Sequence, residues 1–413
     1  MTDLPSSLEQ FATRRFALAG SAVASHFPYC VPVDDLGVAR SGDGPVCSFA
    51  HYDYLNLRTD PRIVDAAKAA IDTFGMGAGA SRLVGGELSI HRAFEAELAR
   101  FIGVDDALSL VSGYGTNVAL VGHLMTKDDL ILVDAAAHNS IMVGTQLSRA
   151  QSMTFRHNDL EHLAKLLSQN RSSYSRVLVV IEGLYSMDGD IPDLPKILDL
   201  CRRHTAWLMV DEAHSIGVLG DTGRGLSEHF GIDAPEIDLI VGTLSKAFGT
   251  CGGFIAGKRR VIEWLRFTLP SFVYSVGLQP PGVAAAMAAL RILREEPERL
   301  TLMRANSDHL ITTARQLGFD CGTAVGTAVI PIMFRSIEDA LRAASALLDA
   351  GFFVPPIVQI AVPKDAPRIR FFVTARHQPQ QIDTALNVLL PYAARGANAP
   401  ESSIRKFSSR AAR

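Results

Sequence analysis

The sequence is poor in cysteine and has almost no excess charge. Its five cysteines are scattered over 413 residues, are odd in number and include no Cys-x-x-Cys pair. This usage argues against a disulfide framework or a zinc site, and it favours free thiols in a reducing compartment. Lys and Arg (40) nearly balance Asp and Glu (43), so the charge does not indicate nucleic acid or an anionic membrane as a partner.

Long apolar segments are also absent. No apolar run reaches the length of a membrane-spanning helix, and the N-terminal stretch MTDLPSSLEQFATRRF is too polar for a secretory signal. We therefore expect a cytoplasmic protein with no integral membrane segment and no metal site. What is present is a globular composition, with 48% hydrophobic and 20% charged residues, which is enough for a large core.

The middle of the chain alternates between strand-like and helix-like segments. The runs SRVLVVIEG, TAWLMVDEAH, DLIVGTLS and CGGFIAG are almost unbroken in their apolar character, and DLPKILDLCRRH between two of them has helical spacing. Unbroken apolar strands separated by helices are typical of a parallel sheet that is covered on both faces. We therefore predict an α/β fold.

The two ends of the chain have different patterns. The first 45 residues are mixed, with one short predicted helix and a turn at RSGDGP. A long helix is predicted from about Pro281 over GVAAAMAALRILREEPERL, and a smaller region with two strands (TAVIPIMF, PRIRFFVTA) and two helices (SIEDALRAASALLDAG, QPQQIDTALNVLLPYAA) follows. We expect an N-terminal segment (1–58), a large domain (59–295), a small C-terminal α+β domain (296–395) and a disordered tail (396–413).

One lysine lies in an unusual context. In VGTLSKAFGTCGGFIAG, Lys246 is surrounded by glycines, small hydroxyl residues and apolar residues. A buried lysine has a lowered pKa and is a good nucleophile toward an aldehyde. The alternative is a lysine that extends from a strand end into solvent.

Polar residues near this lysine complete a chemical pattern. The strand TAWLMV ends in DEAHSIG, which holds Asp211 and His214, and Lys246 follows 35 residues after Asp211. In parallel sheets, ligands bind beyond the carboxyl ends of the strands. Pyridoxal phosphate needs a lysine for its aldehyde, an acid at its ring nitrogen, donors for its phenolic oxygen and a phosphate cradle.

A candidate phosphate cradle is the helix start SGYGTN, because a glycine-rich helix N-terminus offers free N–H groups to an anion. Thr243 and Ser245 beside the lysine would add hydroxyl donors, and turn capping is their alternative role.

These stretches together resemble the α-oxoamine synthases, pyridoxal-phosphate enzymes of fold type I that include 8-amino-7-oxononanoate synthase, glycine C-acetyltransferase and serine palmitoyltransferase. The resemblance runs from about residue 48 to 390. Its motifs are YDYLNL, GAGASRLVGGELSIHRAFEAELARF, SGYGTN, DAAAHNSI, FRHNDLEHL, IEGLYSMDGDIPDLPKI, VDEAHSIGVLGDTGRGL, GTLSKAFGTCGGFIAG and RIRFFVTARH. EGLYSMDGDIPDLP and PRIRFF are most similar to members that work beside polyketide or fatty-acid pathways.

The resemblance implies a large domain whose mostly parallel seven-stranded sheet lies between helices, with a smaller α+β domain after it. It also implies that Lys246 binds the cofactor aldehyde as a Schiff base and that Asp211 pairs with the pyridine nitrogen. The other implied cofactor contacts are His214 and Ser186 at the phenolic oxygen, His138 on the ring face, Gly113 and Tyr114 at the phosphate with Thr243 and Ser245 nearby, and Ser275 at the phosphate of the other subunit in a homodimer.

Two positions concern the substrate. The resemblance implies that Arg370 binds the amino-acid carboxylate; Arg368 and Arg370 alternate, so on a strand both point to the same face. Tyr52 stands where many members have asparagine, and it is a candidate substrate-binding residue. Several members also carry an arginine before a Pro-Pro pair, and VPPIVQIAVPKDAPRIR has none before Arg368. A second carboxylate anchor is therefore not identified.

The implied reaction is a decarboxylative condensation. A small amino acid (serine, alanine or glycine) and an acyl thioester, carried by coenzyme A or an acyl carrier protein, give an α-amino ketone, carbon dioxide and a free thiol. The alternatives are an aminotransferase or lyase on the same fold, and a regulatory subunit of a heteromeric synthase. Such subunits lack the lysine that is present here as Lys246.

Overall fold

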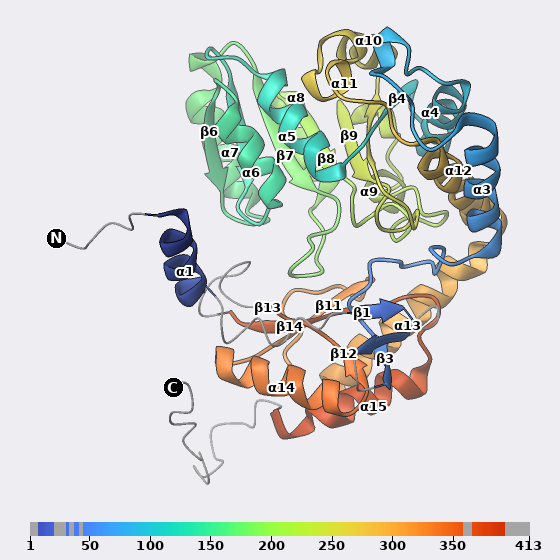
Figure 1. Cartoon of the computed structure of the whole chain (residues 1–413). Helices are drawn as coiled ribbons and strands as arrows, with labels where there is room; N and C mark the ends of the chain where they lie inside the picture. The colour runs from blue at the N-terminus through green and yellow to red at the C-terminus, as the bar shows by residue number, and fades with distance from the viewer. Residues whose placement is uncertain (1–6, 20–29, 33–36, 41–43, 358–365, 393–413) are drawn as a thin grey trace.

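The computed structural model describes residues 7–19, 30–32, 37–40, 44–357 and 366–392 (Figure 1). The predicted N-terminal helix is present as α1 (Leu8–Ala19). Residues 41–43 of the RSGDGP turn and the predicted tail, which begins at residue 396, lie outside the described residues. The division of the chain into four segments stays a prediction.

A seven-stranded sheet forms the larger part of the structure, with the strand order β4-β10-β9-β8-β7-β5-β6. β10 is antiparallel to its neighbours β4 and β9, and the remaining pairs are parallel. The strands are β4 (Asp106–Leu110), β5 (Leu130–Asp134), β6 (Gln151–Phe155), β7 (Val177–Glu182), β8 (Trp207–Asp211), β9 (Leu239–Thr243) and β10 (Gly253–Gly257). The four apolar runs predicted as strands correspond to β7, β8, β9 and β10.

Helices pack on both faces of this sheet (Figure 1). On one face lie α3 (Pro61–Phe74), α4 (Ser89–Ile102), α7 (Leu160–Asn170), α8 (Leu194–Arg203) and α12 (Pro280–Glu295). On the other lie α5 (Gly113–Leu124), α6 (Asn139–Leu147) and α10 (Arg259–Thr268). Shorter segments are α9 (Leu226–His229), α11 (Pro270–Val273), and the 3-10 turns η1 (Arg82–Val84), η2 (Arg171–Ser173) and η3 (Ala234–Glu236).

Burial on both faces explains why the strands read as unbroken apolar runs. In β5, Leu130 and Leu132 belong to the core on one face, whereas Ile131 and Val133 belong to the core on the other. Because successive strand residues point to opposite faces, a strand buried on both sides has no position for a solvated side chain. The predicted α/β sheet is confirmed.

The C-terminal part contains the two predicted strands and the two predicted helices. β11 (Val329–Met333), β14 (Arg368–Phe372) and β13 (Pro356–Ile357) form an antiparallel sheet. A second sheet has the order β1-β2-β3-β12, with strands β1 (Cys30–Pro32), β2 (Gly37–Arg40), β3 (Gly44–Ser48) and β12 (Phe352–Phe353). The helices of this part are α13 (Pro297–Gln316), α14 (Ile337–Asp349) and α15 (Pro379–Leu389), and the 3-10 turn η4 (Leu390–Tyr392) follows.

The single long helix predicted across 282–300 is wrong. α12 ends at Glu295, Glu296 is not helical (φ −123°, ψ 67°), and a new helix, α13, begins at Pro297. Proline lacks an N–H group and disfavours helical geometry in the residue before it, so Pro297 divides the apolar pattern into two helices. This break lies where the chain passes from the large sheet to the C-terminal part (Figure 1).

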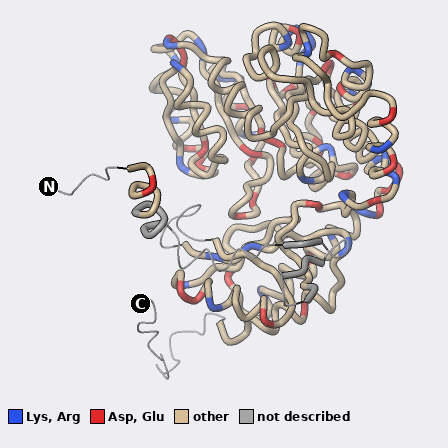
Figure 2. Tube along the Cα trace, viewed as in Figure 1, with Lys and Arg blue, Asp and Glu red and all other residues tan. Residues whose placement is uncertain are grey.

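The distribution of surface charge and the state of the described cysteines agree with what the composition predicts. Basic and acidic residues are interspersed over both parts in the view of Figure 2. The four cysteines whose side chains are described (Cys47, Cys201, Cys251 and Cys321) are free thiols. Within the described ranges, no helix combines the length and the apolar character that crossing a membrane requires.

Candidate active site

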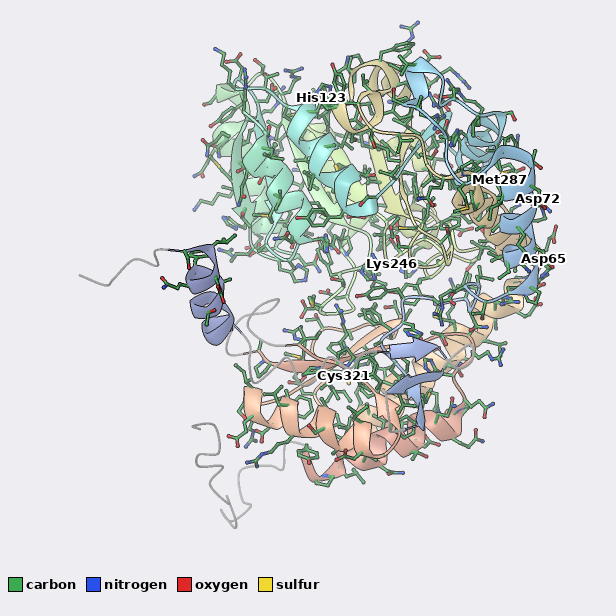
Figure 3. All side chains as sticks on the ribbon, in the orientation of Figure 1. Asp65, Asp72, His123, Lys246, Met287 and Cys321 are labelled. Carbon is green, nitrogen blue, oxygen red and sulfur yellow. The ribbon has the colours of Figure 1, made fainter. Side chains whose placement is uncertain are left out.

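A pocket that is open to solvent lies beyond the carboxyl ends of the strands of the large sheet. Asp211 ends β8, and Lys246 follows β9. Figure 3 shows Lys246 on the side of the sheet that faces the C-terminal part. Seven predicted residues line the pocket: Gly113, Tyr114, His138, Asp211, His214, Thr243 and Lys246.

The Lys246 amine is electrostatically unusual. Burial lowers its pKa to about 8, because the charged form loses hydration; the nearby carboxyl groups of Asp211 and Glu182 oppose this shift, and Arg370 adds to it. Roughly a tenth of this amine is therefore unprotonated at pH 7, far more than for an ordinary lysine. The structure thus favours the nucleophilic alternative for Lys246 over a lysine that extends into solvent.

The Asp211 carboxylate is fixed by two donors. The backbone N–H of Ala213 donates to Oδ1 (2.9 Å), and the side-chain amide of Asn117 donates to Oδ2 (2.6 Å). The same amide nitrogen lies 3.0 Å from the Ser140 hydroxyl. Asn117 was not singled out from the sequence, although it belongs to the SGYGTN motif. Its contact to Asp211 joins residues 94 positions apart, so sequence spacing gave no signal for it.

Glu182 is a second carboxyl group in the pocket. It ends β7, is almost fully buried and accepts a hydrogen bond from the His138 backbone N–H. Burial, reinforced by the nearby Asp211, raises its pKa well above the usual range. Burial therefore favours the protonated form of Glu182, and its contact with the His138 backbone holds the start of α6 in place. The side chain of His138 caps that helix and lies 2.7 Å from the Ser140 hydroxyl.

The start of α5 leaves two backbone amides free. The Ser112 side chain accepts from Gly115 N, and its carbonyl accepts from Thr116 N. The amides of Gly113 and Tyr114 precede these and have no acceptor within the helix. A Cβ atom at Gly113 would lie 2.6 Å from Thr243 Oγ1, so any larger residue would push the hydroxyl away. Glycine thus permits the close approach of α5 to β9.

The hydroxyl residues beside the lysine have local partners. Thr243 Oγ1 donates to the Gly252 carbonyl (3.0 Å) and accepts from Ser245 N (3.2 Å), which is a turn-capping role. Ser245 is exposed and does not line the pocket. Ser275 is also outside it, and its hydroxyl contacts only the Val276 carbonyl among the described residues (3.4 Å).

Arg370 is a buried guanidinium without a carboxylate. Its Nη1 donates to the Ser186 carbonyl (2.6 Å), its Nε has no hydrogen-bond partner, and no Asp or Glu in the described ranges pairs with it. By contrast, Arg368 pairs with Asp188 and donates to the Met187 carbonyl. Both arginines thus point to the loop after β7, as the alternation predicts.

Arg370 acts on the groups of the pocket. After burial, which is the larger cause, its charge further lowers the pKa values of Lys246 and His214. The guanidinium lies 4.3 Å from the ring centre of Phe372, and Tyr52 packs edge-on against the same ring. The Lys246 amine lies 5.9 Å from the centre of the Tyr52 ring. Tyr52 and Arg370 therefore lie close to Lys246 and to their shared neighbour Phe372, although neither is among the residues that line the pocket.

Comparison with known proteins supplies a family for this geometry. The profile of aminotransferase class I and II matches residues 45–389, which is most of the chain. The chain belongs to this family. It is 41% identical over 357 residues to 8-amino-7-oxononanoate synthase of Anaeromyxobacter dehalogenans, covering 86% of this chain and 89% of that one. It is 36% identical over 349 residues to serine palmitoyltransferase of Bacteroides thetaiotaomicron, covering 84% and 88%.

Solved structures agree. The serine palmitoyltransferase of S. paucimobilis, with a bound PLP–myriocin aldimine, superimposes with a TM-score of 0.87 at 31% identity, covering 94% of this chain and 98% of that one. The two named relatives of this class I and II family member, 8-amino-7-oxononanoate synthase and serine palmitoyltransferase, are α-oxoamine synthases. The predicted fold type, the enzymatic class and pyridoxal phosphate as cofactor are thereby confirmed.

The residues present fit that cofactor. The pocket combines a lysine amine of lowered pKa, a carboxylate fixed by two donors and a helix start with two free amides. These are the groups that the aldehyde, the ring nitrogen and the phosphate require. The individual assignments of Lys246, Asp211, Gly113 and Tyr114 remain predictions that this arrangement supports.

A charged cluster connects the loops that follow β6 and β7 to the end of β5. His157 lies 2.8 Å from Asp134 and 3.0 Å from Asp190. Burial disfavours the charged ring, but the two carboxylates outweigh burial and raise the pKa of His157 to about 10. Asp188 is close enough for a shared ion. However, both ring nitrogens of a protonated His157 are donors, so the ring offers no lone pair to a metal.

We expect His157→Gln to lower the free energy of unfolding near neutral pH by about 1–3 kcal/mol, since two charge-assisted hydrogen bonds are lost. The folded-state pKa of about 10 exceeds the ordinary value of 6.5, so this stabilisation is complete below pH 6.5 and is lost as pH rises through 10. Urea unfolding of the wild type and of His157→Gln at several pH values measures the difference in unfolding free energy. This difference should become smaller at alkaline pH.

The control is His309→Gln, which removes a half-exposed pair with Asp383 (2.7 Å). Exposed ion pairs contribute little to stability, so His309→Gln should change the free energy of unfolding only slightly. A wild-type advantage over His157→Gln that stays constant across the alkaline range would contradict a protonated His157.

Proposed function

We propose that this protein condenses a small amino acid (serine, alanine or glycine) with an acyl thioester of coenzyme A or an acyl carrier protein. A bond forms between Cα of the amino acid and the acyl carbonyl carbon, while the bonds to sulfur and to the carboxyl carbon break. The products are an α-amino ketone, carbon dioxide and a free thiol. The composition and the scattered thiols favour the cytoplasm as its location.

The observation that carries this proposal is a pair of basic groups, Lys246 and Arg370, close enough for the charge of one to affect the pKa of the other. The Lys246 amine, with a pKa of about 8, lies on the large sheet, and Arg370, which has no carboxylate partner among the described residues, lies on the C-terminal part. The first can take a proton from Cα, and the second can bind the carboxylate of the same amino acid. Relatives that are α-oxoamine synthases support the acyl thioester as the second substrate.

Pyridoxal phosphate, when bound, supplies an aldehyde for the amino group and a ring that withdraws electrons from Cα. The protein's own residues then divide the remaining work. Asp211, held by Asn117 and Ala213, presents a fixed negative charge to the ring nitrogen. The free amides of Gly113 and Tyr114 bind the phosphate, and the Tyr114 ring lies edge-on to His138 at 6.1 Å. His138 covers one face of the pocket.

We expect Arg370→Ala to weaken amino-acid binding roughly ten- to a hundredfold, because a charge-assisted pair contributes about 1.5–3 kcal/mol. Cofactor binding and the apparent affinity for the thioester should change little. Steady-state kinetics with each substrate varied in turn, and cofactor titration, measure these effects. Arg370→Lys should recover only part of the loss, since lysine cannot bond both carboxylate oxygens.

Arg368→Ala is the matched control. Arg368 already pairs with Asp188, so its loss should lower stability and leave the amino-acid KM nearly unchanged. If both variants raise that KM equally, or if Arg370→Ala impairs the thioester instead, the carboxylate assignment is wrong.

A substrate matrix tests the function as a whole. Serine, alanine and glycine are each combined with coenzyme A and carrier-protein thioesters of different chain lengths, and products are read by mass. Release of carbon dioxide and thiol supports the proposal. Formation of a 2-oxo acid without thiol release would indicate an aminotransferase, and inactivity of cofactor-loaded protein toward every pair would leave the regulatory-subunit alternative.

We infer that the functional unit is a homodimer. Tyr274 (87% exposed) and Val276 (51%) lie beside the segment that holds Met76 (63%) and Val84 (78%), because Ser81 and Val276 form a β-bridge. Four large apolar side chains this exposed on adjoining loops favour a covered surface. Ser275 lies between Tyr274 and Val276, so a partner on this surface would meet it. Dilution is expected to lose cofactor and activity together in light scattering and assay, and a fully active monomer would refute the dimer.

A further inference from the structure

A buried phenol contacts one of the pocket histidines. Tyr54 is 0% exposed, and its hydroxyl lies 2.7 Å from Nδ1 of His214. Within the described ranges, this hydroxyl has no other hydrogen-bond partner. The His214 ring is nearly parallel to that of Phe372, at 6.2 Å and 9°. The imidazole is therefore held in orientation by packing, and at one nitrogen by Tyr54.

The protonation states of Tyr54 and His214 determine the direction of this hydrogen bond. Burial raises the pKa of Tyr54 well above its usual range, so the phenol keeps its proton and needs an acceptor. Burial, with Lys246 and Arg370 adding to it, lowers the pKa of His214 well below 6.5, so the ring is neutral. A neutral imidazole has one donor and one acceptor nitrogen. If Nδ1 carried the hydrogen, the phenol hydrogen would be buried without an acceptor.

The other nitrogen has a different environment. His214 lines the pocket, and none of the described residues makes a hydrogen bond to its Nε2. With Nδ1 occupied as acceptor, the ring hydrogen must lie on Nε2. The pocket therefore receives a neutral donor from His214.

We propose that Tyr54 is a positioning residue that fixes the Nε2–H tautomer of His214, so that this ring donates a hydrogen bond into the pocket. The identity of the accepting oxygen, the phenolic oxygen of bound pyridoxal phosphate, rests on the proposed function. The tautomer itself does not, because it follows from contacts within the chain.

The first test is Tyr54→Phe in the holoenzyme, read by nitrogen NMR of labelled histidine, with the His214 signals assigned from a His214→Gln variant. The wild type should show a protonated Nε2 and an accepting Nδ1. The variant should lose this fixed pattern and show a mixture of tautomers. Tyr185→Phe is the matched control, because Tyr185 is equally buried but its ring packs on His157 at 4.4 Å. An unchanged His214 pattern in folded Tyr54→Phe overturns the proposal.

The second test is the pH dependence of the holoenzyme's visible absorbance. A hydrogen-bond donor stabilises the charged form of an anionic oxygen. Loss of the His214 donor should therefore move the midpoint of the absorbance change to higher pH by roughly one unit. Lys246, Arg370 and His138 also act on His214 and are unchanged in the variant. A general packing defect is excluded by a double-mutant cycle, in which Tyr54→Phe should add no shift once His214 is glutamine.

A shift that persists in the His214→Gln background would mean that Tyr54 acts by another route, and the proposal would fail. These readouts are independent of product formation. A protein that shows the expected tautomer but makes no α-amino ketone would therefore refute the proposed function and retain this inference.

Discussion

Lys246→Ala is expected to lose covalent attachment of the cofactor and to lower turnover by at least about 10²- to 10⁴-fold, the contribution of a positioned acid–base group. The physical reason is the amine's environment: burial lowers its pKa to about 8, so it can both react with an aldehyde and accept a proton. Borohydride reduction of the holoenzyme, followed by proteolysis and mass spectrometry, locates the attachment.

Two controls sharpen this result. Lys258→Ala removes an exposed lysine just before α10 and should leave both attachment and turnover unchanged. Lys246→Arg keeps a positive charge but has no amine that can lose its proton, and it should behave like alanine. Wild-type turnover in Lys246→Ala would remove the basis of the proposed function.

Asp211→Asn is expected to retain cofactor and to slow loss of the Cα proton by about 10²- to 10³-fold, the usual cost of removing one electrostatic stabilising group. The negative charge that Asn117 and Ala213 hold at the end of β8 disappears, while the size of the side chain is kept. Exchange of the Cα proton in deuterated water, followed by NMR without any thioester, isolates this step.

Glu182→Gln is the matched control in the same pocket. Burial raises the pKa of Glu182 well above its usual range and favours its neutral form, which glutamine resembles in size and charge. It should slow exchange far less than Asp211→Asn does. Near-normal exchange in Asp211→Asn, or equal loss in both variants, would contradict the assigned role of Asp211.

The sequence predicted the large sheet well because its signal is local. β7 is apolar at every position before its last residue, Glu182, which follows from burial on both faces. Lys246 and Asp211 were also identifiable, because a strand end followed by a polar residue is readable without knowing the tertiary contacts. The helix break at Glu296 was missed, since the apolar spacing continues across Pro297 and outweighed the proline.

The supporting contacts of the site could not be predicted. Asn117 reaches Asp211 across 94 residues, and Tyr54 reaches His214 across 160. Both lie in motifs that were recognised, but a motif does not state which side chain touches which. Strand alternation alone did not distinguish Arg368 from Arg370, and the family resemblance selected Arg370. The structure adds a physical difference, since Asp188 pairs with Arg368.

The location of Arg370 on β14 and of Lys246 after β9 has a mechanical consequence. An amino acid bound by both groups would span the large sheet and the C-terminal part, so its binding would depend on the spacing between them. This spacing is set at the α12–α13 junction, outside the pocket. At the junction, Glu296 pairs with Arg62 and Arg299, and Arg299 pairs with Asp60. Substitutions at this junction would therefore change the spacing between Lys246 and Arg370, and with it the geometry of the reaction. They would do so without altering any residue that contacts the substrate.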